Sequence, residues 1–492
     1  MEKLPSPRGI RALFSPVDLT RGSCWKTILR FSLPIILSYL LQQVYTISDA
    51  AIVGQTLTAA EVAGVNDTGA LTFIFLQFAF GASAGFCVIT SCRFGARDER
   101  GVRRSLVSQL YLSALLTAVL TVAALFLLDP MLSWIHITPE NAAVYTAAHT
   151  YCTVIFVGIG AQFFYNFICS FLRSMGDSAT PLLFLFFSTV LNIFLDLLFI
   201  RAFSLGVFGA AFATVLAQAI SAAACFVYAF VKYPALRLQR EDFHITLREL
   251  WEHSVRGIPL GLQFSVLAIG IIVMQAGVVA FDMTDGVIVS HAAQNGYGAA
   301  NKIYFLIYTP VNALGTAMTS FTAQNLGAGE TERIRRGTLQ TLGIMAILSA
   351  AAMVLNLLLS RNGAYLYLFL SPDKVTPDTV RFGNAYLYTA TATAVLLGFL
   401  FVVRSCVQGI EKSLFVFLAG VGELFARIVI CLLLPPLVAG GTVSAAAPTI
   451  AFVALSAADP FAWLCADVVL CIPFFRNILK KNYAYREVPA LR

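Results

Sequence analysis

The stretch FSLPIILSYLLQQVYTIS at residues 31–48 contains no aspartate, glutamate, lysine or arginine. About 20 apolar residues in a helix cross the roughly 30 Å hydrocarbon core of a bilayer, and one charge at the helix centre costs about 3 kcal/mol. Nine other stretches of at least 18 residues are equally free of charge: 68–92, 105–128, 141–172, 178–195, 202–231, 257–281, 303–329, 337–360 and 382–403. Two further apolar segments, near 412–434 and 458–475, contain isolated charges. The sequence therefore predicts twelve membrane-spanning helices.

The composition excludes several classes of protein. Of the 492 residues, 58% are hydrophobic and only 12% are charged, whereas an average globular chain is about one quarter charged. This hydrophobicity excludes an ordinary soluble protein and a disordered chain, and the sequence has no dense basic face for nucleic acid. A transmembrane β-barrel would show short alternating segments, which are absent. We therefore expect an all-α polytopic membrane protein.

The basic residues indicate how the chain lies in the membrane. With a cytoplasmic N-terminus, 27 of the 33 lysines and arginines fall on the cytoplasmic side, five fall outside, and Arg427 lies within a span. Positive residues concentrate in the cytoplasmic segments of membrane proteins, where they also meet anionic lipids. We expect a multi-pass protein of the cell membrane, with both termini in the cytoplasm and lipids as its neighbours, and no acidic partner is needed.

The two halves of the sequence resemble each other. Landmark residues recur at offsets of 225, 232 and 233 residues: Pro34 with Pro259, Gly95 with Gly327, and Gly176 with Gly409. Such similar offsets indicate a duplication of six helices per copy, with a pseudo-twofold axis along the membrane normal. The corresponding division has five parts: a cytoplasmic N-terminal segment (1–25), a first lobe (26–231), a cytoplasmic linker (232–250), a second lobe (251–476) and a cytoplasmic tail (477–492).

Polar side chains inside the predicted spans are candidates for function, because lipid offers an ionisable group no compensation. Asn192 and Asp196 are four residues apart and therefore project from one face of their helix. Gln42 and Tyr45 share a face with Asp49, which by itself would also suit the membrane interface. Two carboxylates with amide and hydroxyl neighbours can share a proton or bind a hard cation.

Other polar residues of the spans have alternative roles. Glu423 and Arg427, four residues apart, are expected to neutralise each other as a structural ion pair. Asp467 has no evident partner in the sequence. Three more residues suit either the wall of a cavity or hydrogen bonds between helices: Gln162, Asn166 and Gln263.

The sequence contains no signature of an enzyme. The short motifs of nucleotide and hydrolytic sites are absent, and the five histidines lack metal-ligand spacing. The ten cysteines occur without a Cys-x-x-Cys pair, which favours small buried side chains over disulfides or a metal site. We therefore expect neither an enzyme nor a cofactor, and any uphill transport must use an ion gradient.

Five parts of the sequence form a specific pattern: Pro34 through Asp49 to Gly54, RSMGDSATP at 173–181, LNIFLD at 191–196, ANKI at 300–303 and QNLGAG at 324–329. Together they resemble the multidrug and toxic compound extrusion (MATE) family of antiporters, and the resemblance covers nearly all of residues 26–480. It implies a V-shaped pair of six-helix lobes that opens a central cavity to each side of the membrane in turn. It also implies efflux of small organic, often cationic, compounds in exchange for H⁺ or Na⁺.

The resemblance also implies where the coupling ion binds. In the DinF-like branch this site lies in the first lobe, and it corresponds here to four residues that are also the candidate Na⁺ ligands: Asp49, Asn192, Asp196 and Thr214. The candidates for the substrate cavity are five polar residues, the first two of which match polar positions of the same lobe: Gln42, Tyr45, Gln162, Asn166 and Gln263. The other main bacterial branch has acidic groups in two helices that lack them here, 257–281 and 382–403. A coupling site in the second lobe is therefore not expected.

The leading hypothesis is a monomeric secondary antiporter that exports organic compounds by alternating access, driven by H⁺ or Na⁺. A lipid-linked sugar flippase of the same superfamily is the nearest alternative. It would need basic side chains in its cavity for the diphosphate, and the charge-free stretches contain none. A membrane-embedded enzyme and a receptor or scaffold are further alternatives. The sequence leaves both the coupling ion and the substrate open.

Overall fold

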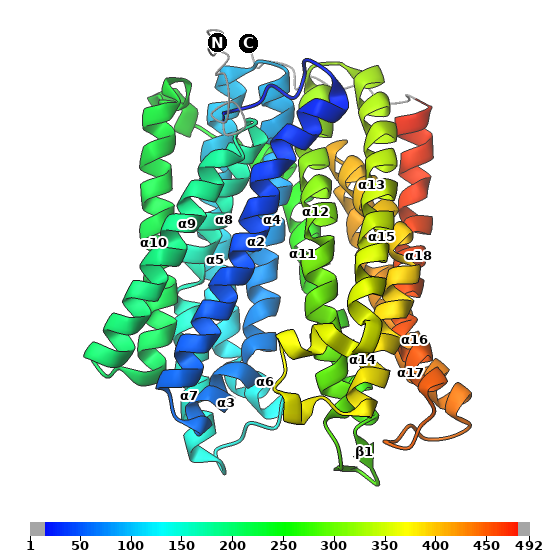
Figure 1. The fold of residues 1–492 in the computed structure, drawn as a ribbon. Coiled ribbons are helices and arrows are strands. Elements are labelled where there is room, and N and C mark those ends of the chain that lie inside the picture. Colours follow the sequence, from blue (N-terminus) through cyan, green and yellow to red (C-terminus); the bar gives the residue numbers. More distant parts are fainter. Residues whose placement is uncertain (1–14, 481–492) are drawn as a thin grey trace.

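The computed structural model describes residues 15–480, and it is helical apart from one short hairpin (Figure 1). Strands β1 (Met283–Thr284) and β2 (Val287–Ile288) pair antiparallel around a turn at Asp285 and Gly286, both of which have positive φ. Such a turn matches the right-handed twist of a hairpin. The predicted all-α polytopic membrane fold is confirmed. Residues 1–14 and 481–492, parts of the predicted cytoplasmic N-terminal segment and tail, lie outside the described residues.

The first half of the molecule, coloured blue to green in Figure 1, contains ten helical elements. They are α2 (Cys24–Thr56), α3 (Ala59–Asp67), α4 (Gly69–Gly95), α5 (Glu99–Phe126), α6 (Leu128–Trp134), α7 (Ala142–Val157), α8 (Ile159–Ser174), α9 (Ala179–Asp196), the π-helical η1 (Leu197–Ala202) and α10 (Gly206–Lys232). Two short turns, η2 (Pro234–Leu236) and η3 (Arg240–Phe243), then cross to the second half.

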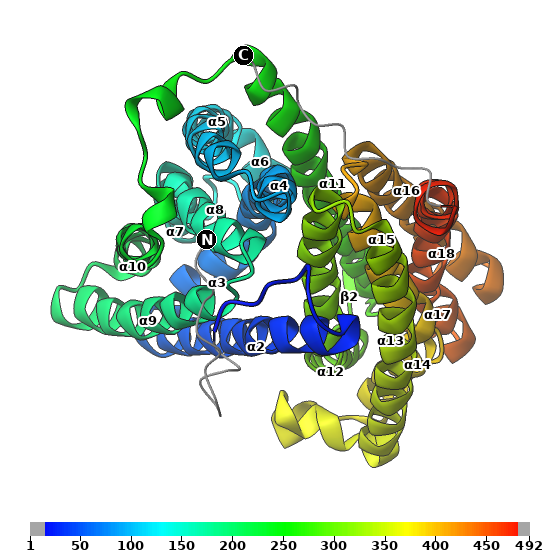
Figure 2. The same cartoon turned by 90° about the horizontal axis from the view of Figure 1, so that it is seen from above.

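The second half, green to red, lies beside the first half (Figures 1 and 2). Its helices are α11 (Leu247–Ala280), α12 (Ala292–Gly327), α13 (Thr331–Ser360), η4 (Arg361–Leu368), η5 (Pro372–Lys374), α14 (Pro377–Ala392), α15 (Ala394–Gly409), α16 (Ser413–Ala439), α17 (Thr449–Ser456), α18 (Ala458–Pro473) and η6 (Phe474–Leu479). Helix α2 begins at Cys24 and α11 at Leu247, slightly before the predicted starts of the two lobes. The lobe bounds themselves stay predictions.

One predicted span differs from the others in polarity. Among residues 15–480, nine helices are long and apolar enough to cross a membrane, or up to eleven if each of two bent pairs is one span. The remaining predicted span, the eighth along the chain, is the 36-residue α12, and it is not apolar enough to meet the same criterion. It packs against α2 and α4 of the first half and against α13, α14 and α15, and Figure 2 shows it between α2 and α14. Because protein surrounds it, α12 can contain more polar side chains than a helix in lipid.

The two bent pairs occupy equivalent places in the two halves. Helices α7 and α8 meet at Gly158 with a bend of 45°, and α14 and α15 meet at Thr393 with a bend of 52°. Each pair forms the fourth predicted span of its half. A side chain at Gly158 would collide with Val215 of α10, so this glycine lets α10 pack against the bend. The shared break supports the internal duplication.

The two halves pack most closely at the end of the bundle where α2 begins. Gly95 of α4 lies against the backbone of Gln324 in α12, and Gly327 of α12 lies against the backbone of Cys92. A side chain at either glycine would collide with the opposing backbone, so only glycine permits this approach. The side-chain amide of Gln324 also donates to the carbonyl oxygen of Ser174, 2.7 Å away. We refer to this end as the closed end.

A strap made of residues 17–22 crosses the closed end. The backbone N–H of Val17 donates to the carbonyl oxygen of Gly176 in the first half, at 2.9 Å. The guanidinium of Arg333 in α13 donates to the carbonyl oxygen of Leu19 at 3.2 Å. Leu19 is fully buried, and burial of one leucine side chain contributes about 2 kcal/mol. The strap therefore links the two halves by both hydrogen bonds and apolar packing.

The linker between the halves is also fixed to the first half. Arg103 of α5 pairs with Asp242 of η3 at 2.9 Å, and Arg104 pairs with Glu249 at the start of α11 at 2.6 Å. Both arginines are among the basic residues that the sequence analysis used to orient the chain. In the structure they bind acidic side chains of the same chain, so part of the excess basic charge is compensated internally.

Candidate functional site

A cluster of polar side chains lies inside the first half, where α2, α9 and α10 meet. Asn192 and Asp196 project from the same side of α9, and both are fully buried. The side-chain amide of Asn192 donates to the hydroxyl of Thr214 on α10, at 3.4 Å. Asp49 of α2 interacts electrostatically with Asp196. The structure thus brings together the four residues that the family resemblance implied for ion coupling.

The carboxylate of Asp196 has an unusual environment for a buried acidic group. Neither of its oxygens accepts a hydrogen bond from the described residues, and the side-chain oxygen of Asn192 also lacks a partner. No basic side chain forms an ion pair with Asp49 or Asp196 among residues 15–480. A buried acid with free oxygens is costly unless a proton or a cation satisfies it. The cluster therefore has the oxygen ligands that H⁺ or Na⁺ requires.

Two tyrosines surround the carboxylates. Tyr45 of α2 and Tyr151 of α7 both interact electrostatically with Asp49 and Asp196. Tyr45 was a candidate for the substrate cavity, whereas Tyr151 was not selected from the sequence. An aromatic residue within a long apolar run gives no signal that distinguishes it from ordinary core packing. In addition, α9 changes to the π-helical η1 directly after Asp196, and π-helical turns are frequent at functional sites.

A separate cavity of about 480 Å³ lies between the two halves. Gln42 of α2 and Gln263 of α11 are on its wall, but Tyr45, Gln162 and Asn166 are not among its lining residues. Two of the five cavity candidates therefore line the cavity, and three do not. Gln263 is fully buried, and neither atom of its side-chain amide has a hydrogen-bond partner. This volume suits a drug-sized molecule.

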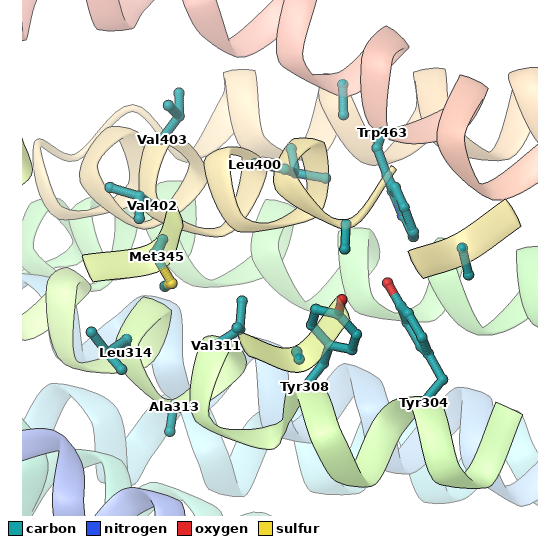
Figure 3. Packing of buried hydrophobic residues seen from close by; sticks show 14 of the residues in the cluster. Tyr304, Tyr308, Val311, Ala313, Leu314, Met345, Leu400, Val402, Val403 and Trp463 are labelled. Carbon is teal, nitrogen blue, oxygen red and sulfur yellow. The ribbon is translucent and has the colours of Figure 1, made fainter. Parts of the chain in front are cut away.

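Aromatic side chains of the second half form one wall of the cavity. Tyr304 and Tyr308 project from α12 with ring centroids 4.3 Å apart, and Figure 3 shows Tyr304 directed toward Trp463, with Leu400 nearby. Neither tyrosine hydroxyl has a hydrogen-bond partner in the described chain. Aromatic rings with free hydroxyls can bind flat apolar compounds and also donate a hydrogen bond.

A chain of ion pairs crosses the same wall. Glu423 lies 3.7 Å from Arg427, so the predicted ion pair is present. Each of its members also has a second partner: Glu423 pairs with Arg404 of α15, and Arg427 pairs with Asp459 of α18 at 3.0 Å. The hydroxyl of Tyr386 donates to Asp459. All four charged groups lie on the cavity wall, and their two positive and two negative formal charges balance.

Two members of this network could not be predicted from the sequence, for different reasons. Arg404 directly follows the charge-free stretch 382–403, a position that predicts a residue on the cytoplasmic side of the span, but α15 continues to Gly409 and places it on the cavity wall. Asp459 is 32 residues from Arg427, too far for a helical spacing to reveal. The basic residues of the cavity all lie outside the charge-free stretches: Arg173, Arg404 and Arg427.

Comparisons with known proteins agree with this architecture. The sequence model of the MatE family matches residues 34–198 and 270–433, one match in each half, which agrees with the internal duplication. The chain is 32% identical to the probable multidrug resistance protein YpnP of Bacillus subtilis, over 80% of this chain and 84% of that protein. It is 29% identical to the probable multidrug resistance protein YoeA of the same organism, over 76% and 82% of the two chains.

A solved structure has the same fold. It is described as an outward-facing conformation of a multidrug resistance MATE family transporter, and it superposes with a TM-score of 0.80 at 22% identity over 95% of this chain and 99% of that one. Among residues 15–480, no group of three or more histidine, cysteine or acidic side chains is arranged to hold a metal ion. The protein is a multi-pass membrane protein of the MATE family, whose members are transporters and not enzymes.

Proposed function

We propose that the protein exports small organic compounds in exchange for H⁺ or Na⁺, by alternating access to the cavity between its halves. The buried cluster around Asp49 and Asp196 carries this proposal, because its free carboxylate oxygens lie apart from the cavity and can accept an ion while the cavity holds another molecule. The relatives named as multidrug resistance proteins support export of organic compounds.

Helix α2 connects the three parts that such a cycle requires. It contains Asp49 of the polar cluster and also Tyr39 and Gln42 of the cavity wall. At its beginning, the backbone N–H of Trp25 donates to the side chain of Gln340 on α13, at 3.1 Å. Neutralisation of the carboxylates by an ion changes how α2 is held, and α2 transmits this change to the cavity and the closed end. Such coupling requires the ion to bind the two orientations of the protein with different affinity.

The contacts at the closed end favour one orientation of the protein in the membrane. The hydrogen bonds of the strap and the contacts of Gly95 and Gly327 join the halves there. We propose that this end faces the cytoplasm, with both termini on that side, and that the structure represents the outward-facing state of the cycle. Both halves come from one chain, so a monomer contains the complete cavity. We also retain the DinF-like branch as a proposal, because its implied ion site coincides with the polar cluster.

A drug-sized substrate fits the cavity better than a lipid-linked oligosaccharide does. The volume of about 480 Å³ lies within the range of sites for drug-sized molecules. Three arginines line the cavity, contrary to the sequence-based argument that basic side chains are missing. Two of them, Arg404 and Arg427, are already paired with acidic residues. They are therefore less available for a diphosphate than unpaired arginines would be.

Transport in everted membrane vesicles tests the proposal. The probes are ethidium, rhodamine 123 and rhodamine 110, and vesicles without the protein are the control. We expect accumulation of at least one probe, which a protonophore abolishes if H⁺ is the coupling ion and a sodium ionophore abolishes if Na⁺ is. Accumulation of all three probes equal to that of the control vesicles, or accumulation that persists after both gradients are collapsed, would overturn the proposal.

A further inference from the structure

The end of the cavity next to the closed end is polar on both sides. Arg173 and Ser174 from α8 face it in the first half, and Arg404 and Ser405 from α15 face it in the second half. These two Arg-Ser pairs are 231 residues apart in the sequence, close to the offsets of the other repeated landmarks. Each also lies near the end of the second helix of a bent pair: Ser174 is the last residue of α8, and Ser405 lies four residues before the end of α15. The duplication has therefore placed one arginine in each half of the same cavity.

The two arginines differ in their partners. Arg404 pairs with Glu423, which also contacts Arg427, and Asp467 of α18 interacts electrostatically with Arg404. Arg173 has no acidic side chain within 4.0 Å and makes no side-chain hydrogen bond in the described part of the chain. It is the only charged residue among the first-half residues that line the cavity. The wall of the first half thus has one uncompensated positive charge.

An arginine of this kind is a ready binding group for an anion. Its guanidinium is permanently charged, and its planar fork matches a carboxylate in a bidentate arrangement. Ser170, one helical turn before Arg173, and Ser91 of α4 also line the cavity and can add hydroxyl donors. A single uncompensated charge matches a monoanion better than a diphosphate, because each additional negative charge would need its own partner.

The opposite wall is suited to the rest of such a molecule. Tyr304, Tyr308 and Trp463 offer aromatic surface, and the unpartnered amide of Gln263 can bind one polar substituent. We infer that the cavity recognises aromatic or apolar compounds that contain a carboxylate, and that Arg173 binds this carboxylate. The inference narrows the substrate class of the proposed exporter and rests on that proposed function. It predicts that zwitterionic or anionic compounds are better substrates than simple cations.

A matched pair of dyes tests the inference by binding alone. Rhodamine 110 has a free carboxylate, and rhodamine 123 is its methyl ester and is otherwise identical. We measure the fluorescence polarisation of each dye with the purified full-length protein in detergent. A hydrogen-bonded charge pair predicts that the protein binds rhodamine 110 about tenfold or more tightly than rhodamine 123.

Substitutions then test whether Arg173 causes the preference for rhodamine 110. Arg173→Gln should lower the affinity for rhodamine 110 by about tenfold and change that for rhodamine 123 by less than about twofold. Arg173→Lys, which keeps the charge, should retain part of the preference. Arg237→Gln, at an exposed linker position, is the matched control and should bind both dyes as the natural protein does.

Two outcomes would overturn the inference: equal binding of the two dyes by the natural protein, or an unchanged dye preference in Arg173→Gln, whether or not both affinities fall. If Arg173→Gln does not fold, the dye preferences of the natural protein and of Arg173→Lys still test the inference. Because binding needs no ion gradient, an Arg173-dependent preference without transport in vesicles would contradict the proposed function and leave this inference standing.

Discussion

Each half of the molecule contains a buried group of acidic side chains, and the two groups differ in their partners. In the first half, Asp196 has two free carboxylate oxygens, and Asp49 is its acidic neighbour. In the second half, Glu423 and Asp459 are paired with arginines. Acidic residues at membrane depth therefore differ in their capacity to bind an ion. A carboxylate paired with arginine is already neutralised, whereas an unpaired carboxylate must bind a proton or a cation.

The comparison shows that burial alone does not identify an ion site. Glu423 is 2% exposed and Asp196 is 0% exposed, so their accessibility does not separate them. Their partners distinguish the two carboxylates. A carboxylate paired with arginine is neutralised within the fold, whereas a carboxylate without a cationic partner can still bind an ion. We therefore expect substitutions in the first-half cluster to change transport, and substitutions in the second-half network to change stability.

The largest effect should follow from Asp196→Asn. This change removes the charge and keeps the size of the side chain, so ion-coupled export should fall at least tenfold, to the level of vesicles without protein. The melting temperature should stay the same or rise, because an unpaired buried carboxyl is lost. Dye accumulation in everted vesicles and thermal unfolding in detergent measure the two quantities. Asp373→Asn, at an exposed position, is the control, and export by Asp196→Asn at the natural rate would disprove the coupling role.

A second substitution tests whether the second-half network is structural. Arg427→Met leaves Asp459 and Glu423 without this partner, and loss of one member of a buried ion pair costs about 3–5 kcal/mol. We expect a clearly lower melting temperature in detergent. The double variant Arg427→Met/Asp459→Leu should recover much of the loss, because apolar residues can replace a buried pair. Loss of export in Arg427→Met with an unchanged melting temperature would instead assign the network to transport.

The smallest effect is expected for Thr214→Val. This change removes the hydroxyl that accepts the 3.4 Å hydrogen bond from Asn192 and nearly preserves the volume. One such bond is worth about 0.5–1.5 kcal/mol, so export should decrease several-fold without being abolished. Thr189→Val is a matched control, because the hydroxyl of Thr189 bonds only to Leu185 within its own helix. Equal export by the two variants would remove Thr214 from the proposed ion site.

The spans could be predicted from the sequence because lipid imposes a simple rule on them. Charge-free stretches of sufficient length correspond to helices throughout the described chain, including α12, whose polarity reflects its position between the halves. The bends at Gly158 and Thr393 could not be predicted, because both interrupt stretches that are continuously free of charge. Neither could the strap, since residues 17–22 show no periodic pattern and depend on contacts with Gly176 and Arg333.

The candidate site also has features that could be predicted from the sequence and features that could not. The spacing of Asn192 and Asp196 places them on one helix face, and this local relation was visible in the sequence. The pairing of Asp459 with Arg427 and the position of Arg404 on the cavity wall depend on contacts between different helices. A single sequence contains no signal for such contacts.

The strap has a practical consequence for work on this protein. Leu19 is fully buried, and the guanidinium of Arg333 donates to the carbonyl oxygens of Leu19 and Gly22. A purification tag, a fluorescent fusion or a truncation placed directly before residues 17–22 acts on this contact. Such an alteration weakens the link between the two halves and leaves the helices of the described residues intact. A label for activity measurements is therefore better attached at a site remote from residues 17–22.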